Sequence, residues 1–258
     1  MSLYLALAGL VVVADRVLDA GGRANVALTL GAGATVITAG LNNAWAPVVY
    51  RTAALDRGRV LDETTRAVAA VTLVVAGTVA LLAPWLLRVA APGSYQPDAL
   101  VPAVVLAAAA AVPSVVYLAS GHLVFASGRT GWLAVSTPLS VACGLVWAVL
   151  LAPHWGMVAI GSGYLVAYLL LTMATTLVQR GVSPTPWRPP LLPVVTVAWL
   201  ATTVLGALLP AAGPGAAVRV LGVLVLAGGL LARLRRRPRP PISHTRSASP
   251  TTGTSAGA

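Results

Sequence analysis

The chain has 258 residues, of which 58% are hydrophobic and only 9% are charged. Soluble domains carry about 25% charged residues, so this composition excludes a globular protein that folds in water and indicates a lipid environment. All 17 basic residues are arginines, against 6 acids, but they lie in short gaps and one C-terminal cluster rather than on one basic face, which argues against nucleic-acid binding.

Eight apolar segments follow one another along the chain. Because a helix rises 1.5 Å per residue, about 20 residues cross the ~30 Å hydrocarbon core of a bilayer. Segments two to seven have that length, segment eight is at its short end, and segment one would span only about 18 Å. We therefore predict an all-α bundle of about eight membrane helices, the first one truncated, in a chain that begins part-way through a membrane helix. The segments are 3–14, 26–46, 67–87, 100–126, 132–152, 157–178, 191–209 and 216–232.

The arginines fall mainly in every second gap between these segments. If the N-terminus is inside, the gaps at 47–66, 127–131 and 179–190 and the tail after 232 are inside as well, and they hold most of the arginines. Positive residues are retained on the cytoplasmic side of a membrane. We therefore expect a multi-pass protein of the cytoplasmic membrane with both termini inside. The outer gaps hold only Arg16, Arg23, Arg88 and Arg219.

Residues 233–258 differ from the rest of the chain. A cluster of arginines is followed by prolines, serines, threonines and glycines without apolar periodicity. Such a composition buries too little surface to offset the entropy of ordering, so we expect a disordered cytoplasmic tail.

Signals of enzymatic chemistry are absent from the sequence. There is no metal-ligand spacing, no phosphate-binding loop and no pair of carboxylates inside an apolar segment. The single cysteine, Cys143, lies within an apolar segment and is interpreted as a buried filler. We expect no enzyme, no cofactor and no metal.

The richest polar cluster ends the second segment and contains Asn42, Asn43, Trp45 and, beyond Pro47, Arg51. Adjacent asparagines point about 100° apart on a helix, so at least one should face protein or a water-filled cavity. Trp45 suits the bilayer interface. Two interpretations remain open: hydrogen bonding between helices at an interfacial helix end, or a polar patch at the cytoplasmic mouth of a transport cavity.

The fourth segment carries a second group of polar residues. Ser114, Tyr117 and Gly121 share one helical face, His122 lies about one turn from the cytoplasmic end, and Pro113 predicts a kink. Tyr117 and His122 are candidates to line the same mouth. Such a histidine is more often a hydrogen-bonding group at a helix end, although its titration near neutral pH would suit transport.

Small residues are frequent in the second and sixth segments. In lipid they allow helix backbones to approach closely, so a packing role is expected for them. The glycines concerned are Gly31, Gly33, Gly40, Gly161 and Gly163.

Five short motifs occur in an order that resembles one known family. They are Ala14-Asp15-Arg16; Leu41-Asn42-Asn43-Ala44-Trp45-Ala46-Pro47; Ala83-Pro84-Trp85-Leu86-Leu87 ahead of Tyr95; the turn Gly128-Arg129-Thr130; and Leu151-Ala152-Pro153-His154-Trp155-Gly156-Met157-Val158-Ala159. Over about residues 10–180 this set resembles the lipid-linked oligosaccharide flippases of the O-antigen and polysaccharide export type, within the multidrug/oligosaccharidyl-lipid/polysaccharide exporter superfamily.

The resemblance implies a domain organisation and a function. Residues 1–180 would be the C-terminal six-helix bundle of an exporter, 181–232 two additional membrane helices, and 233–258 the tail. The protein would move lipid-linked oligosaccharide or polysaccharide precursors across the membrane by alternating access. Its partners would be membrane lipid, the lipid-linked glycan and either an N-terminal half or a second copy of the chain. The candidate cavity residues are Asn42, Asn43, Trp45, Arg51, Tyr117 and His122.

Two alternative functions belong to other classes. A non-transporting membrane scaffold, or a truncated or degenerate half-transporter, is favoured by the short first segment and the missing partner bundle. A drug/cation antiporter of the same superfamily is disfavoured because no acid lies in the middle of a segment, where it would couple protons or sodium.

Overall fold

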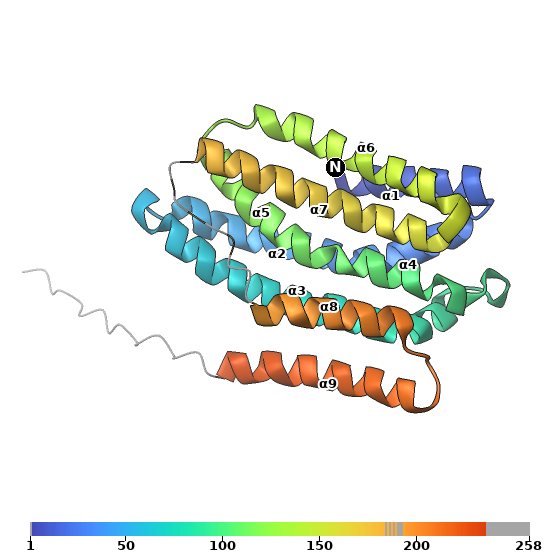
Figure 1. Cartoon of the computed structure of the whole chain (residues 1–258). Coiled ribbons are helices and arrows are strands. Elements are labelled where there is room, and N and C mark those ends of the chain that lie inside the picture. Colours follow the sequence, from blue (N-terminus) through green and yellow to red (C-terminus); the bar gives the residue numbers. More distant parts are fainter. Residues whose placement is uncertain (1, 184, 186, 188, 190–192, 236–258) are drawn as a thin grey trace, which may run out of the picture.

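The computed structural model describes residues 2–183, 185, 187, 189 and 193–235, and this part of the chain is helical without a strand (Figure 1). Over its described residues each predicted apolar segment lies in a helix, and the fourth is divided between α4 and α5, so the all-α prediction is confirmed. The helices are α1 Ser2–Leu18, α2 Gly21–Arg51, α3 Ala54–Ala90, the short η1 Gly93–Tyr95, α4 Pro97–Ala109, α5 Ala111–Ala126, α6 Gly131–Trp155, α7 Met157–Val182, α8 Pro193–Leu208 and α9 Gly213–Arg235.

Six helical stretches among the described residues are long and apolar enough to cross a membrane. They are α2, α3, α4 with α5, α6, α7 and α9, while α8 is apolar but shorter. Their exposed side chains are largely aliphatic or aromatic, as on the outer face of α6 at Trp132, Val135, Leu139 and Leu150. Such faces suit acyl chains rather than water, so this is a multi-pass membrane protein.

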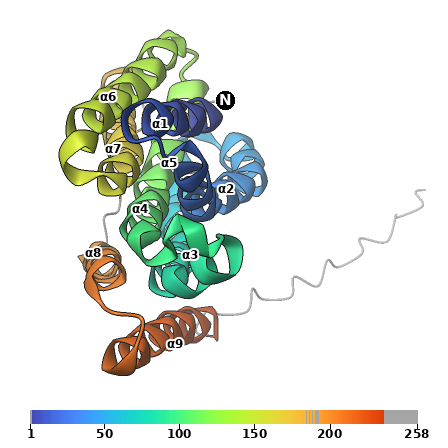
Figure 2. The same ribbon diagram turned by 90° about the vertical axis from the view of Figure 1, so that its right-hand side faces the viewer.

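The continuous pair α4–α5 forms the centre of the bundle, surrounded by α2, α3 and α7 with α1 and α6 outside them (Figure 2). Close helix crossings rest on small residues. A Cβ added to Gly31 would lie 2.5 Å from the Cβ of Ala107, and one added to Gly161 would lie 2.6 Å from the Ala103 backbone. Gly163 meets Gly144 in the same way, which confirms the packing role expected for three of the five glycines.

Pro113 breaks the central helix pair, as the sequence predicts. Proline has no N–H, so the carbonyl four residues earlier, on Ala109, loses its partner within the helix. The chain turns at Ala110, and the indole N–H of Trp199 in α8 donates to the Ala109 oxygen at 3.0 Å. The single hydroxyl proton of Thr172 in α7 is shared between the carbonyl of Pro113, at 2.9 Å, and that of Tyr168 in its own helix, at 2.7 Å. The kink is therefore stabilised by donors from two neighbouring helices.

Pro84 in α3 opens a second carbonyl, on Ala80, by the same mechanism. Arg219 of α9 lies 3.5 Å from this oxygen and donates to the carbonyl of Leu81 at 2.9 Å. Its other terminal nitrogen donates to the carbonyls of Gly206, at 3.0 Å, and Leu209, where α8 ends. Arg219 is 1% exposed and lies in the second turn of α9, so it is a buried helical residue and not a residue of a gap between helices. The other three arginines assigned to outer gaps, Arg16, Arg23 and Arg88, also lie within helices, each in the first or last turn.

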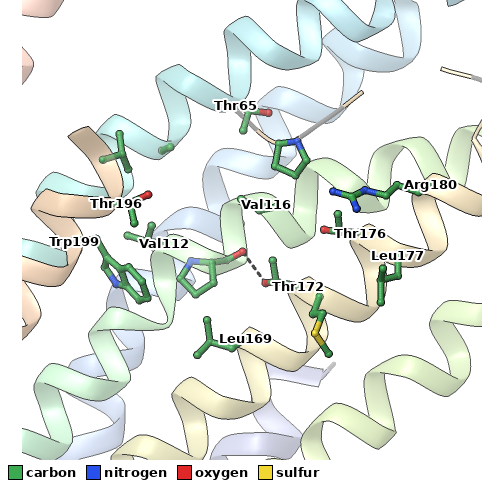
Figure 3. A pocket seen from close by; sticks show the side chains of 15 residues that line it. Thr65, Val112, Val116, Leu169, Thr172, Thr176, Leu177, Arg180, Thr196 and Trp199 are labelled. Carbon is green, nitrogen blue, oxygen red and sulfur yellow. Dashed lines mark hydrogen bonds between the residues drawn. The ribbon is translucent and has the colours of Figure 1, made fainter. Parts of the chain in front are cut away.

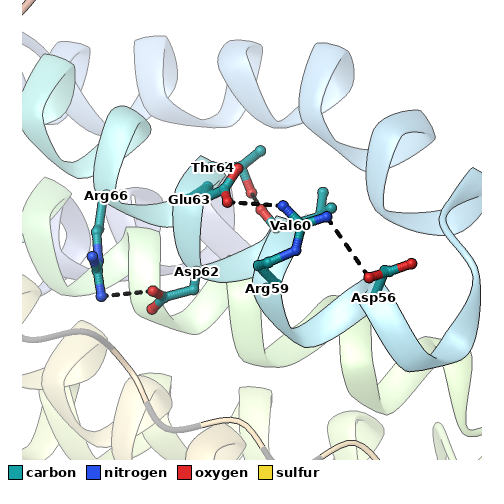
Figure 4. Close-up of polar contacts among 7 residues, drawn as sticks. All are labelled: Asp56, Arg59, Val60, Asp62, Glu63, Thr64 and Arg66. Carbon is teal, nitrogen blue, oxygen red and sulfur yellow. Dashed lines mark hydrogen bonds and ion pairs between the residues drawn. The ribbon is translucent and has the colours of Figure 1, made fainter. Parts of the chain in front are cut away.

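The prediction that residues 47–66 form a loop between helices is also wrong for most of this range. Residues 54–66 are helical rather than a loop, and their acids pair with arginines one turn away: Arg59 with Asp56 at 3.7 Å and with Glu63 at 3.1 Å, and Arg66 with Asp62 at 2.6 Å (Figure 4). With 37 residues α3 is about 55 Å long, well beyond the hydrocarbon thickness. This charged end therefore extends beyond the apolar layer.

Of the remaining sequence predictions, some are confirmed and one is wrong. The turns at Gly128 and Gly156 are confirmed, both with positive φ. Cys143 is exposed on α6, so its interpretation as a buried filler is wrong. Arg233 and Arg235 continue α9, and the rest of the tail lies outside the described residues.

We predict that Trp199→Phe lowers the free energy of unfolding by about 1 kcal/mol, because the Ala109 carbonyl loses its donor in an apolar surrounding. In a Pro113→Ala background the restored N–H of residue 113 satisfies that carbonyl, so the same substitution should cost much less. Denaturant titration of the four variants in micelles measures this coupling.

The matched control is Trp147→Phe, which removes an indole donor to the hydroxyl of Ser162 at the bundle surface. This change should cost less than about 0.5 kcal/mol. An equal cost of Trp199→Phe with and without Pro113 would contradict the proline-based account of the kink.

Candidate functional site

Four of the six candidate residues come together where α2 and α5 end. Trp45 and His122 are each 4% exposed, and their rings meet edge to face with centroids 5.1 Å apart. Nδ1 of His122 shares a hydrogen bond of 3.1 Å with the hydroxyl of Tyr50. Trp45 is thus a core residue, packed with Val49 and with Leu123 of α5, and not the interfacial side chain that its position suggested.

A cavity of about 140 Å³ adjoins this aromatic cluster. Asn42, Tyr117 and His122 lie on its wall, together with Tyr50. Oδ1 of Asn42, Nε1 of Trp45 and Nε2 of His122 are buried and lack a hydrogen-bond partner among the described residues. Buried polar atoms normally have partners, so the cluster suits water or a small polar group of a ligand. Its volume is below the roughly 300 Å³ at which ligand pockets begin, so it does not enclose a sugar chain.

Asn43 and Arg51 lie apart from this cluster, on the exposed side of α2. At the 100° spacing of a helix they share one face with Asn25, Thr29 and Gly40, and all five are exposed. An added Cβ at Gly40 or at Gly33 would have no atom within 4 Å. The packing role predicted for these two glycines is therefore wrong. Val36 is an apolar member of this face.

We call this row of residues the α2 polar face. Its polar side chains lie near the two ends of a membrane-spanning helix at the edge of the bundle, Asn25 and Thr29 at one end and Asn43 and Arg51 at the other, with Val36 and Gly40 between them (Figure 2). Amide side chains in hydrocarbon are unfavourable unless they meet polar groups. The α2 polar face is therefore expected to meet water or another protein surface rather than acyl chains.

A much larger cavity, of about 620 Å³, lies between α3, α5, α7 and α8 (Figure 3). Its walls are mostly aliphatic, with Trp199 at the α8 side and four threonine hydroxyl groups among the lining residues. Arg180 extends over one end of it from α7. The sequence analysis missed this site, although Thr172, Thr176 and Arg180 recur at every fourth residue of one helix, which places them on one face.

Unbalanced positive charge gathers at the end of the bundle that holds both cavities. The acids of this end, in the first turns of α3, pair with Arg59 and Arg66. Arg51, Arg129 and Arg180 have no ion-pair partner among the described residues. At the opposite end Arg88 pairs with Asp98 at 3.0 Å. An anionic group should therefore concentrate at the first end.

No group of three or more metal-ligating side chains occurs in the part of the chain that the structure describes. Comparison of the chain with protein-family models, with curated proteins and with solved structures gives no match.

We predict that a cysteine at position 43 reacts with a hydrophilic thiol reagent at least about tenfold faster than one at position 139, because thiolates form in water and not in hydrocarbon. Both positions lie eight residues from the basic end of their helices, and Leu139 is an exposed apolar residue of α6. The measurement uses single-cysteine variants in native membranes, with exposed Cys143 replaced by serine. Equally slow labelling of both positions would place the α2 polar face in lipid.

Proposed function

We propose that this protein is part of a membrane transporter that moves lipid-linked oligosaccharide or polysaccharide precursors across the cytoplasmic membrane by alternating access, with both termini inside. The supporting observation is the uncovered α2 polar face, whose basic end adjoins the cluster of Asn42, Trp45, Tyr117 and His122. Uncovered polar side chains near both ends of a membrane helix, with an arginine at one end, offer contacts to an anionic glycolipid headgroup on the two sides of the membrane.

In this proposal different residues bind the phosphate and the sugars of such a headgroup. Arg51 offers a planar guanidinium to phosphate oxygens at the entrance. Asn43 and Asn25 offer amide donors and acceptors to sugar hydroxyl groups near the two ends of α2. The apolar tail stays in the bilayer, so only the headgroup has to meet the polar face.

The chain contributes only one side of the proposed transport path. Because the α2 polar face is exposed along its length, a second surface is needed to separate the headgroup from lipid. In the proposal this surface belongs to an N-terminal half or to a second copy of the chain. Alternating access would then consist of these two bodies rocking against each other.

The second candidate function is a non-transporting membrane scaffold. The same uncovered face favours it, because polar side chains between membrane helices also hold protein partners. An antiporter has less support, because the described acids lie at helix ends. Asp15 lies in the last turn of α1 and Asp19 directly follows it. Asp56, Asp62 and Glu63 lie in the first turns of α3, and Asp98 lies in the first turn of α4. These are helix ends, where carboxylates are not positioned to couple cations in the membrane.

We predict that deletion of the gene stops export of a surface glycan and that the wild-type gene restores it. The variant Asn43→Leu should restore export at least about tenfold less well, since an apolar side chain removes an amide from the α2 polar face. The assay quantifies glycan on the outer surface against normal amounts of the protein in the membrane.

Leu139→Ala, an exposed apolar position on α6 at the same depth, is the matched control and should restore export fully. Normal export in the deletion strain would count against transport. Export that needs the chain but tolerates Asn43→Leu would favour the scaffold.

A further inference from the structure

The cavity between α3, α5, α7 and α8 plays no part in the proposed transport path. It lies on a different face of α5 from Tyr117 and His122, because Val112, Pro113 and Val116 line it instead. Its apolar lining follows α7 from Leu169 to Arg180, a rise of about 16 Å. Its apolar lining along α7 suits a hydrocarbon chain.

Polar groups gather at one end of this apolar cavity. Arg180 extends across the opening from α7, and Thr65 lies near it on the α3 wall (Figure 3). Thr65 is 2% exposed, and its hydroxyl lacks a hydrogen-bond partner among the described residues. Arg180 likewise has no ion-pair partner there. A cation and a buried free hydroxyl on facing walls form a site for an anionic oxygen.

We infer that this cavity binds one anionic glycerophospholipid of the membrane, with its phosphate between Arg180 and Thr65 and one acyl chain along α7. Charge complementarity at the opening selects an anion, and the aliphatic walls beyond it select a lipid over a soluble phosphate. The volume of about 620 Å³ falls in the usual range for ligand pockets. The site is independent of the proposed transport function.

A bound lipid would also join α8 to the rest of the bundle. Val195 and Trp199 of α8 face the cavity from one side, and Leu169 of α7 faces it from the other. An acyl chain between these walls fills space that the protein leaves open, so it should stabilise the docking of α8.

The test measures lipid retention by the purified full chain. The protein in detergent is exposed to dioleoylphosphatidylglycerol or dioleoylphosphatidylcholine, and the lipids that stay bound are counted by native mass spectrometry. We expect a preference of about fivefold for the anionic lipid, the effect of one arginine near a membrane surface. Arg180→Gln should abolish the preference, and Thr65→Val should reduce it.

Two further variants distinguish the effect of the Arg180 charge from that of the cavity volume. Arg129→Gln removes an arginine from the same end but outside the cavity, and should leave the preference intact. Ala69→Phe fills part of the cavity and should reduce retention of both lipids. Circular dichroism and elution as a single species establish that each variant is folded, and Arg180→Lys, expected to keep part of the preference, serves if Arg180→Gln does not fold.

Several results would overturn the inference. Equal retention of the two lipids by the wild-type chain excludes an anion-selective site. If Arg180→Gln keeps the preference for the anionic lipid, or if Arg129→Gln loses as much of it as Arg180→Gln, the lipid does not bind in this cavity. Displacement of the lipid by glycerol 1-phosphate at equal concentration would show that the site recognises a soluble phosphate instead.

Discussion

A backbone carbonyl without a partner is costly in lipid, and this cost at two prolines explains how the C-terminal helices are positioned. Pro84 opens one carbonyl in α3, and Pro113 opens one at the end of α4. Both open carbonyls lie beside donors from the α8–α9 pair, a guanidinium at Ala80 and an indole at Ala109. The two residues that dock this helical hairpin are polar side chains in otherwise apolar helices. Through α8 they also set one wall of the large cavity.

The sequence predicts the helices well because the length of each apolar segment and the positions of the charged residues are properties of the sequence itself. It predicts contacts poorly, because a face that touches lipid and a face that touches protein are equally apolar. Cys143 was therefore assigned to the core although it is exposed, and Trp45 to the interface although His122 and Val49 surround it. Arg219 was assigned to a gap, whereas its carbonyl partners lie in α3, in α8 and at Leu209 directly after α8.

The sequence brings together some of the candidate residues and not others. Asn42, Trp45, Tyr117 and His122 meet because two neighbouring helices end at the same side of the membrane, which the alternation of segments implies. Asn43 is separated from Asn42 by the 100° turn of the helix, from which the sequence predicts only that at least one of the two faces protein or a water-filled cavity. What the sequence could not show is that one of these surroundings is an uncovered polar face, while the other is a cavity too small for a glycan.

The most direct test of the account concerns the guanidinium that holds α9 against α3. Ala70 of α3 and Leu230 of α9 line one small cleft, so cysteines at these positions should be joined by a short bifunctional thiol reagent in native membranes, with Cys143 replaced by serine. The account predicts rapid joining in the otherwise wild-type chain and a rate at least about tenfold lower after Arg219→Met, which leaves the carbonyls of α3 and α8 without their donor. Equal rates with and without Arg219 would contradict it.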